Sequence, residues 1–117
     1  MMTKEEQQHI ITTTWELHNI VETSYLNHPA KQEDEAWLEK QRILLADMAL
    51  HLLQTSISPE ELKLDRLCDN IHAILTIADQ FLPGADLKKA TTNLYKKNKH
   101  YEKITNRNLY VKHSSIV

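Results

Sequence analysis

Glycine is almost absent from this chain: one residue, Gly84, occurs among 117, against an average usage of roughly 7%. Sheet proteins use glycine at hairpin turns and bulges, where the backbone needs a positive φ angle. Loops that hold phosphate groups use it because the backbone must approach the ligand closely. The shortage therefore argues against a β-sheet protein and against glycine-rich nucleotide-binding loops.

Cysteine and long apolar runs are also scarce. The one cysteine, Cys68, cannot form an intramolecular disulfide, and its helical spacing with apolar neighbours predicts a buried thiol. Asp47 and His51 interrupt the apolar runs, so no stretch approaches the roughly 18 residues of a transmembrane helix. The first residues lack the basic and apolar regions of a secretory signal. We therefore expect a cytoplasmic protein that does not cross a membrane.

The spacing of the apolar residues predicts four helices, at about 3–27, 34–55, 59–82 and 86–104. Thr3 and Glu6 have the spacing of a capping box at the first helix, and Ser58-Pro59 resembles a helix start at the third. In the first two helices, the residues expected to face the core are Ile10, Ile11, Leu17, Ile20, Val21, Tyr25 and Leu26, then Trp37, Leu38, Leu44, Leu45, Met48, Leu52 and Leu53. Asp47 is expected to face water.

The predicted fold is an all-α, antiparallel four-helix bundle with up-down-up-down topology, because short connections favour antiparallel neighbours. Residues 1–104 are expected to form a single domain. Residues 105–117 show no helical stripe and are expected to form an extended or weakly ordered tail. A pair of helical hairpins that completes its core as a homodimer would produce the same pattern.

Seven histidines raise the question of a metal site. Glu6 and His9, and also Asp69 and His72, have the carboxylate-x-x-His spacing found in di-iron helical bundles. Those sites also require a lone glutamate on each of the other two helices, and the second and fourth predicted helices offer none in their apolar stripes. We therefore assign no metal site and no cofactor.

Two Arg–His pairs resemble the arginine-histidine motif of HEPN-type helical ribonucleases. Arg66 precedes His72 by six residues, and Arg107, followed by Asn108, precedes His113 by the same number. The resemblance implies RNA cleavage at these residues, and short motifs of this kind match frequently by chance. The sequence has no local signature of a nucleophile beside an oriented base, so we assign no catalytic residues and expect a protein without enzyme activity. A HEPN-like ribonuclease is kept as an alternative.

Charge is distributed unevenly along the chain. Residues 1–84 carry six basic and fourteen acidic side chains, a net charge of −8, whereas residues 85–117 carry eight basic and two acidic ones, a net charge of +6. This basic segment, with interleaved tyrosines, could follow a phosphate backbone and stack bases. Nucleic-acid binding is therefore an alternative function, through Lys88, Lys89, Lys96, Lys97, Lys99, Lys103 and Arg107.

The preferred hypothesis is binding of a partner protein. Four carboxylates surround a tryptophan between residues 33 and 39, a set that we call the acidic face: Glu33, Asp34, Glu35, Trp37 and Glu39. Charge of one sign beside an aromatic residue provides electrostatic steering together with a side chain that is enriched at interface hot spots. The sequence therefore predicts a small non-catalytic protein that acts as an inhibitor, immunity protein, adaptor or secretion chaperone.

Overall fold

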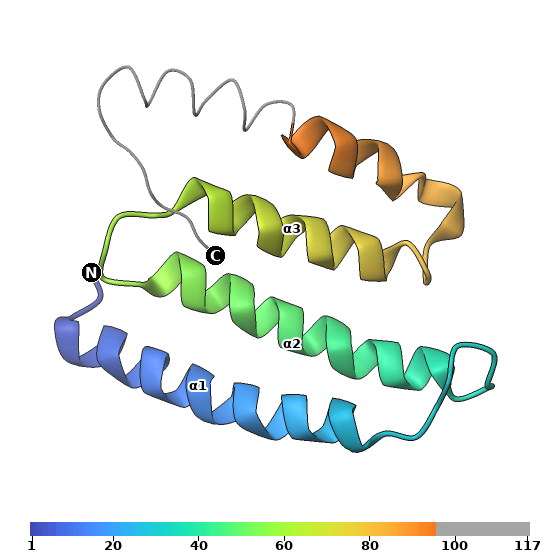
Figure 1. The fold of residues 1–117 in the computed structure, drawn as a ribbon. Helices are drawn as coiled ribbons and strands as arrows, with labels where there is room; N and C mark the ends of the chain where they lie inside the picture. The colour runs from blue at the N-terminus through green and yellow to red at the C-terminus, as the bar shows by residue number, and fades with distance from the viewer. Residues whose placement is uncertain (96–117) are drawn as a thin grey trace. The chain divides into compact units, whose positions relative to one another are not determined.

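The computed structural model describes residues 1–95, and these residues form helices without any strand. The helices are α1 (Lys4–Asn27), α2 (Trp37–Ile57), α3 (Leu64–Ala78) and a short 3₁₀ helix, η1 (Pro83–Ala85); residues 87–95 are again α-helical (Figure 1). The predicted all-α, four-helix fold class is confirmed. The predictions for residues 96–117, including the domain boundary at 104 and the tail, lie outside the described residues.

The chain divides into two compact units. The first is formed by residues 1–61, and the second begins at residue 62. In the first unit, α1 and α2 lie side by side as a helical hairpin (Figure 1). Gln7 donates a hydrogen bond from Nε2 to the carbonyl of Ile57, and the ammonium of Lys40 lies over the ring of Tyr25. These contacts join the start of one helix to the end of the other, so the helices are antiparallel.

The predicted capping box forms at the start of α1. The amide of Glu6 donates to Oγ1 of Thr3 at 3.0 Å, and the amide of Thr3 donates to Oε1 of Glu6 at 2.8 Å. The first amides of a helix have no partner within the helix, so these bonds satisfy two backbone donors. Local sequence is sufficient to fix this helix end.

Replacement of Thr3 by alanine is expected to lower the free energy of unfolding by about 1 kcal/mol, because the cap bond to Glu6 is lost. Thr23→Ala is the matched control. Thr23 is exposed within α1, where alanine has the higher helix propensity, so this variant should be neutral or slightly more stable. Urea denaturation followed by circular dichroism measures both changes, and equal effects of the two substitutions would contradict the capping role.

The start of α3 was predicted wrongly. The helix begins at Leu64, not at residue 59. The hydroxyl of Ser58 accepts the amide of Glu60, two residues later, at 3.2 Å. A helix cap would make the same contact, but residues 59–63 are not helical, so the bond closes a local turn here. Serine and proline therefore mark a turn here, and the helix starts without a side-chain cap.

The start of α2 is three residues later than expected, at Trp37. Asp34 belongs to the preceding turn, because its Oδ2 accepts the amide of Lys31 at 2.8 Å while its own amide donates to the Lys31 carbonyl. These two bonds together close a turn over residues 31–34. Residues 28–36 therefore connect α1 to α2 with a defined conformation at what we call the closed end of the hairpin.

In the second unit, α3 buries Cys68 and Ile77, which confirms the buried thiol. The helix ends at Ala78, earlier than predicted, and turns over residues 79–81 lead to Pro83–Ala85. Asp86 has a positive φ of 55° just before the last described helix. Tyr95, in that helix, donates its hydroxyl to Oδ1 of Asp69 on α3 at 2.8 Å.

Candidate functional site

Within α1 and α2, the positions from which water is most fully excluded hold polar side chains. Thr14, His18, Gln41 and Asp47 are buried. Several leucines and isoleucines expected to face the core are instead exposed: Leu17, Ile20, Leu26, Leu38 and Leu53. Buried polar groups require partners because an unpaired one is costly. The contacts of these residues are therefore the natural place to look for a site.

His18 and Asp47 form a buried pair that connects the two helices. Nδ1 of His18 lies 2.6 Å from Oδ1 of Asp47, and only 8% of His18 and 4% of Asp47 are exposed. A carboxylate oxygen can only accept, so Nδ1 carries the hydrogen and the Nε2 side of the ring points away from Asp47. Asp47 thus fixes both the tautomer and the orientation of the imidazole.

His51, one turn after Asp47 on α2, completes the cluster. Its Nε2 lies 3.4 Å from Oδ2 of Asp47, and its ring meets that of His18 edge to face, with 4.8 Å between the centroids. The side chain of His51 is 36% exposed, so the cluster is accessible to solvent on this side. Trp15 covers another edge of His18, with ring centroids 5.6 Å apart.

Glu22 adds a second carboxylate at the outer side of His18. Its Oε1 lies 3.8 Å from Nε2 of the histidine, one helical turn along α1. The four side chains are imidazoles and carboxylates, which serve as proton donors and acceptors and as ligands for metal ions. One ligand atom from each of His18, Asp47 and His51 falls within 4.8 Å of the others.

Sequence reasoning missed this cluster. Asp47 was expected to face water, and that prediction is wrong, because the residue faces α1 and is buried. The available signal was spacing: His18 and Glu22 are four residues apart, as are Asp47 and His51, which places each pair on one helix face. The carboxylate-x-x-His pattern considered from the sequence has a different spacing and lies elsewhere.

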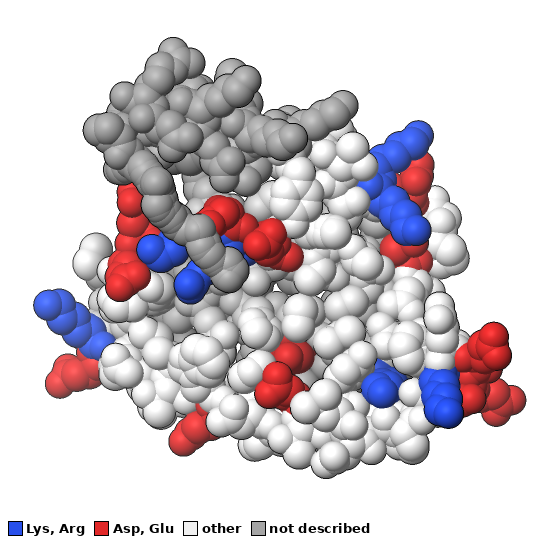
Figure 2. Space-filling model, viewed as in Figure 1, with Lys and Arg blue, Asp and Glu red and all other residues white. Residues whose placement is uncertain are grey.

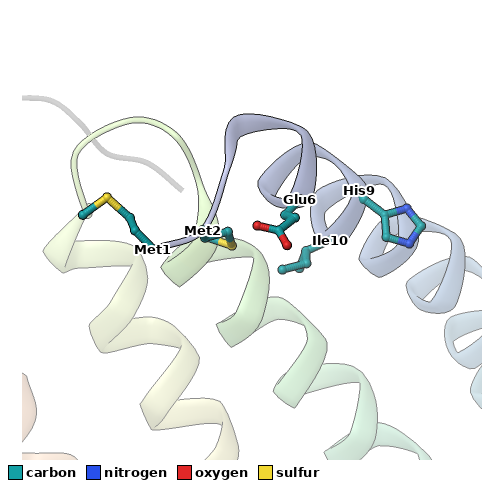
Figure 3. A pocket seen from close by; sticks show the side chains of 5 residues that line it. All are labelled: Met1, Met2, Glu6, His9 and Ile10. Carbon is teal, nitrogen blue, oxygen red and sulfur yellow. The ribbon is translucent and has the colours of Figure 1, made fainter.

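The pairs that were considered have other contacts. Glu6 is part of the capping box, and His9 is exposed on α1. Both line a shallow depression with Met1, Met2 and Ile10, in which the Glu6 carboxylate and the His9 ring point away from each other (Figure 3). This arrangement does not bring the two groups to a common ligand.

Asp69 and His72 both contact Tyr95. The His72 ring lies 5.2 Å from the Tyr95 ring. Partial burial of the phenol, followed by its hydrogen bond to Asp69, raises the pKa of Tyr95 to about 12. These contacts hold the last described helical residues against α3 within the second unit. Asp69 and His72 therefore have a structural role in these contacts.

The structure does not bring Arg66 and His72 together. Arg66 is exposed and His72 is half-buried, and six residues along an α-helix correspond to a rotation of about 240°, which separates their faces. The second pair of the ribonuclease motif, Arg107 and His113, lies outside the described residues.

The acidic face lies at the closed end of the hairpin, where acidic side chains gather beside a few basic ones (Figure 2). Glu33, Asp34, Glu35 and Glu39 are exposed and Trp37 is half-buried. Of these carboxylates, Glu39 pairs with Arg42 at 3.0 Å. The negative charge of this surface therefore comes mainly from residues 33–35.

Of the basic segment, Lys88 and Lys89 belong to the described residues and are exposed. Nζ of Lys89 lies 3.3 Å from Oδ2 of Asp86, so the charge of one lysine is partly compensated. Lys96, Lys97, Lys99, Lys103 and Arg107 lie outside the described residues.

Comparisons with protein-family models, with curated proteins and with solved structures gave no match to this chain. Among residues 1–95, no helix combines the length and the apolar character that a membrane-spanning segment requires.

Proposed function

We propose that the protein binds a partner protein with a basic surface through the acidic face. The observation that carries this proposal is the half-buried position of Trp37 at the start of α2, directly after a turn with exposed carboxylates. An aromatic ring that is partly accessible and partly held by its own helix can contribute apolar contact area with little loss of freedom. The neighbouring charges would steer a basic partner toward it.

The turn that displays the carboxylates is held in place by hydrogen bonds. Besides the two bonds between Lys31 and Asp34, the amide of Trp37 donates to the carbonyl of Asp34 at 3.1 Å. Lys40 is directed toward the Tyr25 ring, with its ammonium 4.9 Å from the centroid. A surface that is ordered before binding loses less conformational entropy in the complex, which favours affinity.

The proposed role is non-catalytic and cytoplasmic, in the class of inhibitors, immunity proteins, adaptors and secretion chaperones. The competing function is nucleic-acid binding through the basic segment, favoured by the exposed Lys88 and Lys89. The two functions use surfaces of opposite charge: the acidic face for a protein partner and the basic segment for nucleic acid. Charge reversal on one surface should therefore abolish one function and leave the other intact.

The test is an affinity capture from native lysate of the source cells, with and without nuclease, followed by mass spectrometry. The variant Glu33→Lys/Glu35→Lys should capture less of the partner by a factor of about ten or more, because two negative charges facing a basic partner become positive. Glu16→Lys/Glu61→Lys is the control, since both residues are exposed and the change in net charge is identical. Equal capture by the two variants would contradict the proposal.

A purified partner permits a direct measurement. Trp15 and Trp37 are the two tryptophans of the chain, so Trp15→Phe leaves Trp37 as the sole tryptophan reporter. Its fluorescence should change with saturable stoichiometry when the partner is added. Retention that disappears with nuclease and with Lys88→Glu/Lys89→Glu would instead establish the nucleic-acid alternative, and self-association alone would establish a homodimer.

A further inference from the structure

We propose that His18, Asp47 and His51 bind a divalent first-row transition-metal ion of the zinc class between α1 and α2. This inference is independent of the acidic face and replaces the expectation that the chain has no metal site. Three donor groups from two helices already lie within 4.8 Å of one another. A single ion among them would contact one imidazole of α1 and one carboxylate and one imidazole of α2.

The donor set selects the class of metal. Two imidazole nitrogens and one carboxylate oxygen are typical ligands of Zn²⁺ and of neighbouring transition ions, whereas Mg²⁺ and Ca²⁺ prefer oxygen ligands throughout. Three protein ligands leave a further coordination position. The exposed side of His51 provides access to it from solvent.

Charge compensation also favours a cation at this position. Asp47 is buried, and in the described residues its ionic contacts are with the two histidines, with neither lysine nor arginine among them. A buried carboxylate is costly without a compensating charge. A divalent ion coordinated by its oxygens would supply that charge directly.

Glu22 has the position of a group that orients a ligand. When Nδ1 of His18 coordinates a metal, the hydrogen of the ring resides on Nε2, and that atom faces Oε1 of Glu22 at 3.8 Å. Metal-bound histidines commonly donate their second N–H to a carboxylate, which fixes the ring and increases ligand basicity. The Glu22 side chain is about half exposed and can close this gap by a small rotation.

Metal binding would displace the hydrogen bond between His18 and Asp47. The 2.6 Å separation of Nδ1 and Oδ1 must widen, because two ligands about 2.0–2.2 Å from one tetrahedral ion lie farther apart than two hydrogen-bonded atoms. The His51 side chain is 36% exposed, so its position is less constrained than that of His18 or Asp47. The same three residues therefore serve as a hydrogen-bonded cluster without metal and as a coordination site with it.

The test is a zinc titration of the full chain, prepared without a polyhistidine tag, against a chromophoric chelator. We expect about one tightly bound Zn²⁺ per chain, which excess Mg²⁺ does not displace. Glu22→Gln removes an orienting group and should weaken zinc binding by roughly 10- to 100-fold. His51→Ala removes a ligand and should weaken zinc binding by more than that. Co²⁺ in place of Zn²⁺ should give a visible absorption spectrum that changes in both variants.

His9→Ala is the matched control, because His9 lies on α1, is exposed and is outside the cluster. Circular dichroism of each variant shows whether the helices are retained, and His51, being half-exposed, is the ligand whose removal disturbs the fold least. Unchanged zinc affinity in a folded His51→Ala variant would overturn the proposal. An equal loss in His9→Ala, or the absence of stoichiometric zinc binding, would overturn it as well.

Discussion

Replacement of His18 by alanine is expected to lower the free energy of unfolding by about 3 kcal/mol, because the buried carboxylate of Asp47 loses its closest partner. His51, 3.4 Å from the other oxygen, retains part of the compensation, so the effect should lie at the lower end for a broken buried pair. Urea denaturation with a chelator present measures the change without any contribution from bound metal.

Two further variants separate the pair from its surroundings. His9→Ala removes an exposed imidazole from the same helix and should change stability by less than about 0.5 kcal/mol. His18→Leu/Asp47→Leu removes both polar partners and should recover most of the stability lost in His18→Ala, since no unpaired charge remains buried. If the double variant is no more stable than His18→Ala, the cost does not come from an uncompensated carboxylate.

Ile77→Ala is the second substitution with a large expected effect, a loss of about 3 kcal/mol in the free energy of unfolding. Ile77 is 6% exposed at the end of α3, and truncation there removes apolar contact and leaves a cavity. Ile20→Ala is the same chemical change on α1, at a residue that is 64% exposed. It should alter stability by no more than about 0.5 kcal/mol.

The comparison of the two isoleucines tests the apolar pattern directly, because helical periodicity places Ile20 in a stripe that faces a core, whereas the structure exposes it. In thermal and urea unfolding, the Ile77→Ala variant should be much less stable than the Ile20→Ala variant. Similar destabilisation by both would show that Ile20 is covered in the folded protein, for example by another copy of the chain. That outcome would support the homodimer considered from the sequence.

Local interactions made several features predictable. The all-α class follows from the scarcity of glycine together with helical periodicity, and the start of α1 follows from a capping box between residues three apart. The buried thiol of Cys68 follows from its position among apolar neighbours on one helix face. In each case the interacting groups are close in the chain, so that sequence spacing alone determines the contact.

The start of α3 shows where local signals become ambiguous. Ser58 followed by a proline is compatible with a helix cap and with a turn, and both use the serine hydroxyl as an acceptor. Which of the two forms depends on how the chain leaves α2 and where Leu64 packs. The cap motif alone therefore does not determine whether a helix or a turn forms.

The helical class and the start of the first helix could be predicted from the sequence, because those properties rest on contacts within a few residues. The inward orientation of Asp47 depends on packing between the helices, because its partner His18 lies twenty-nine residues away in the chain. His51 lies beside both. Periodicity assigns polar residues to the solvent side by default, since burial without a partner is unfavourable. Here the antiparallel pairing of α1 and α2 places His18 next to Asp47, so the buried carboxylate has a partner and the polar cluster is stable.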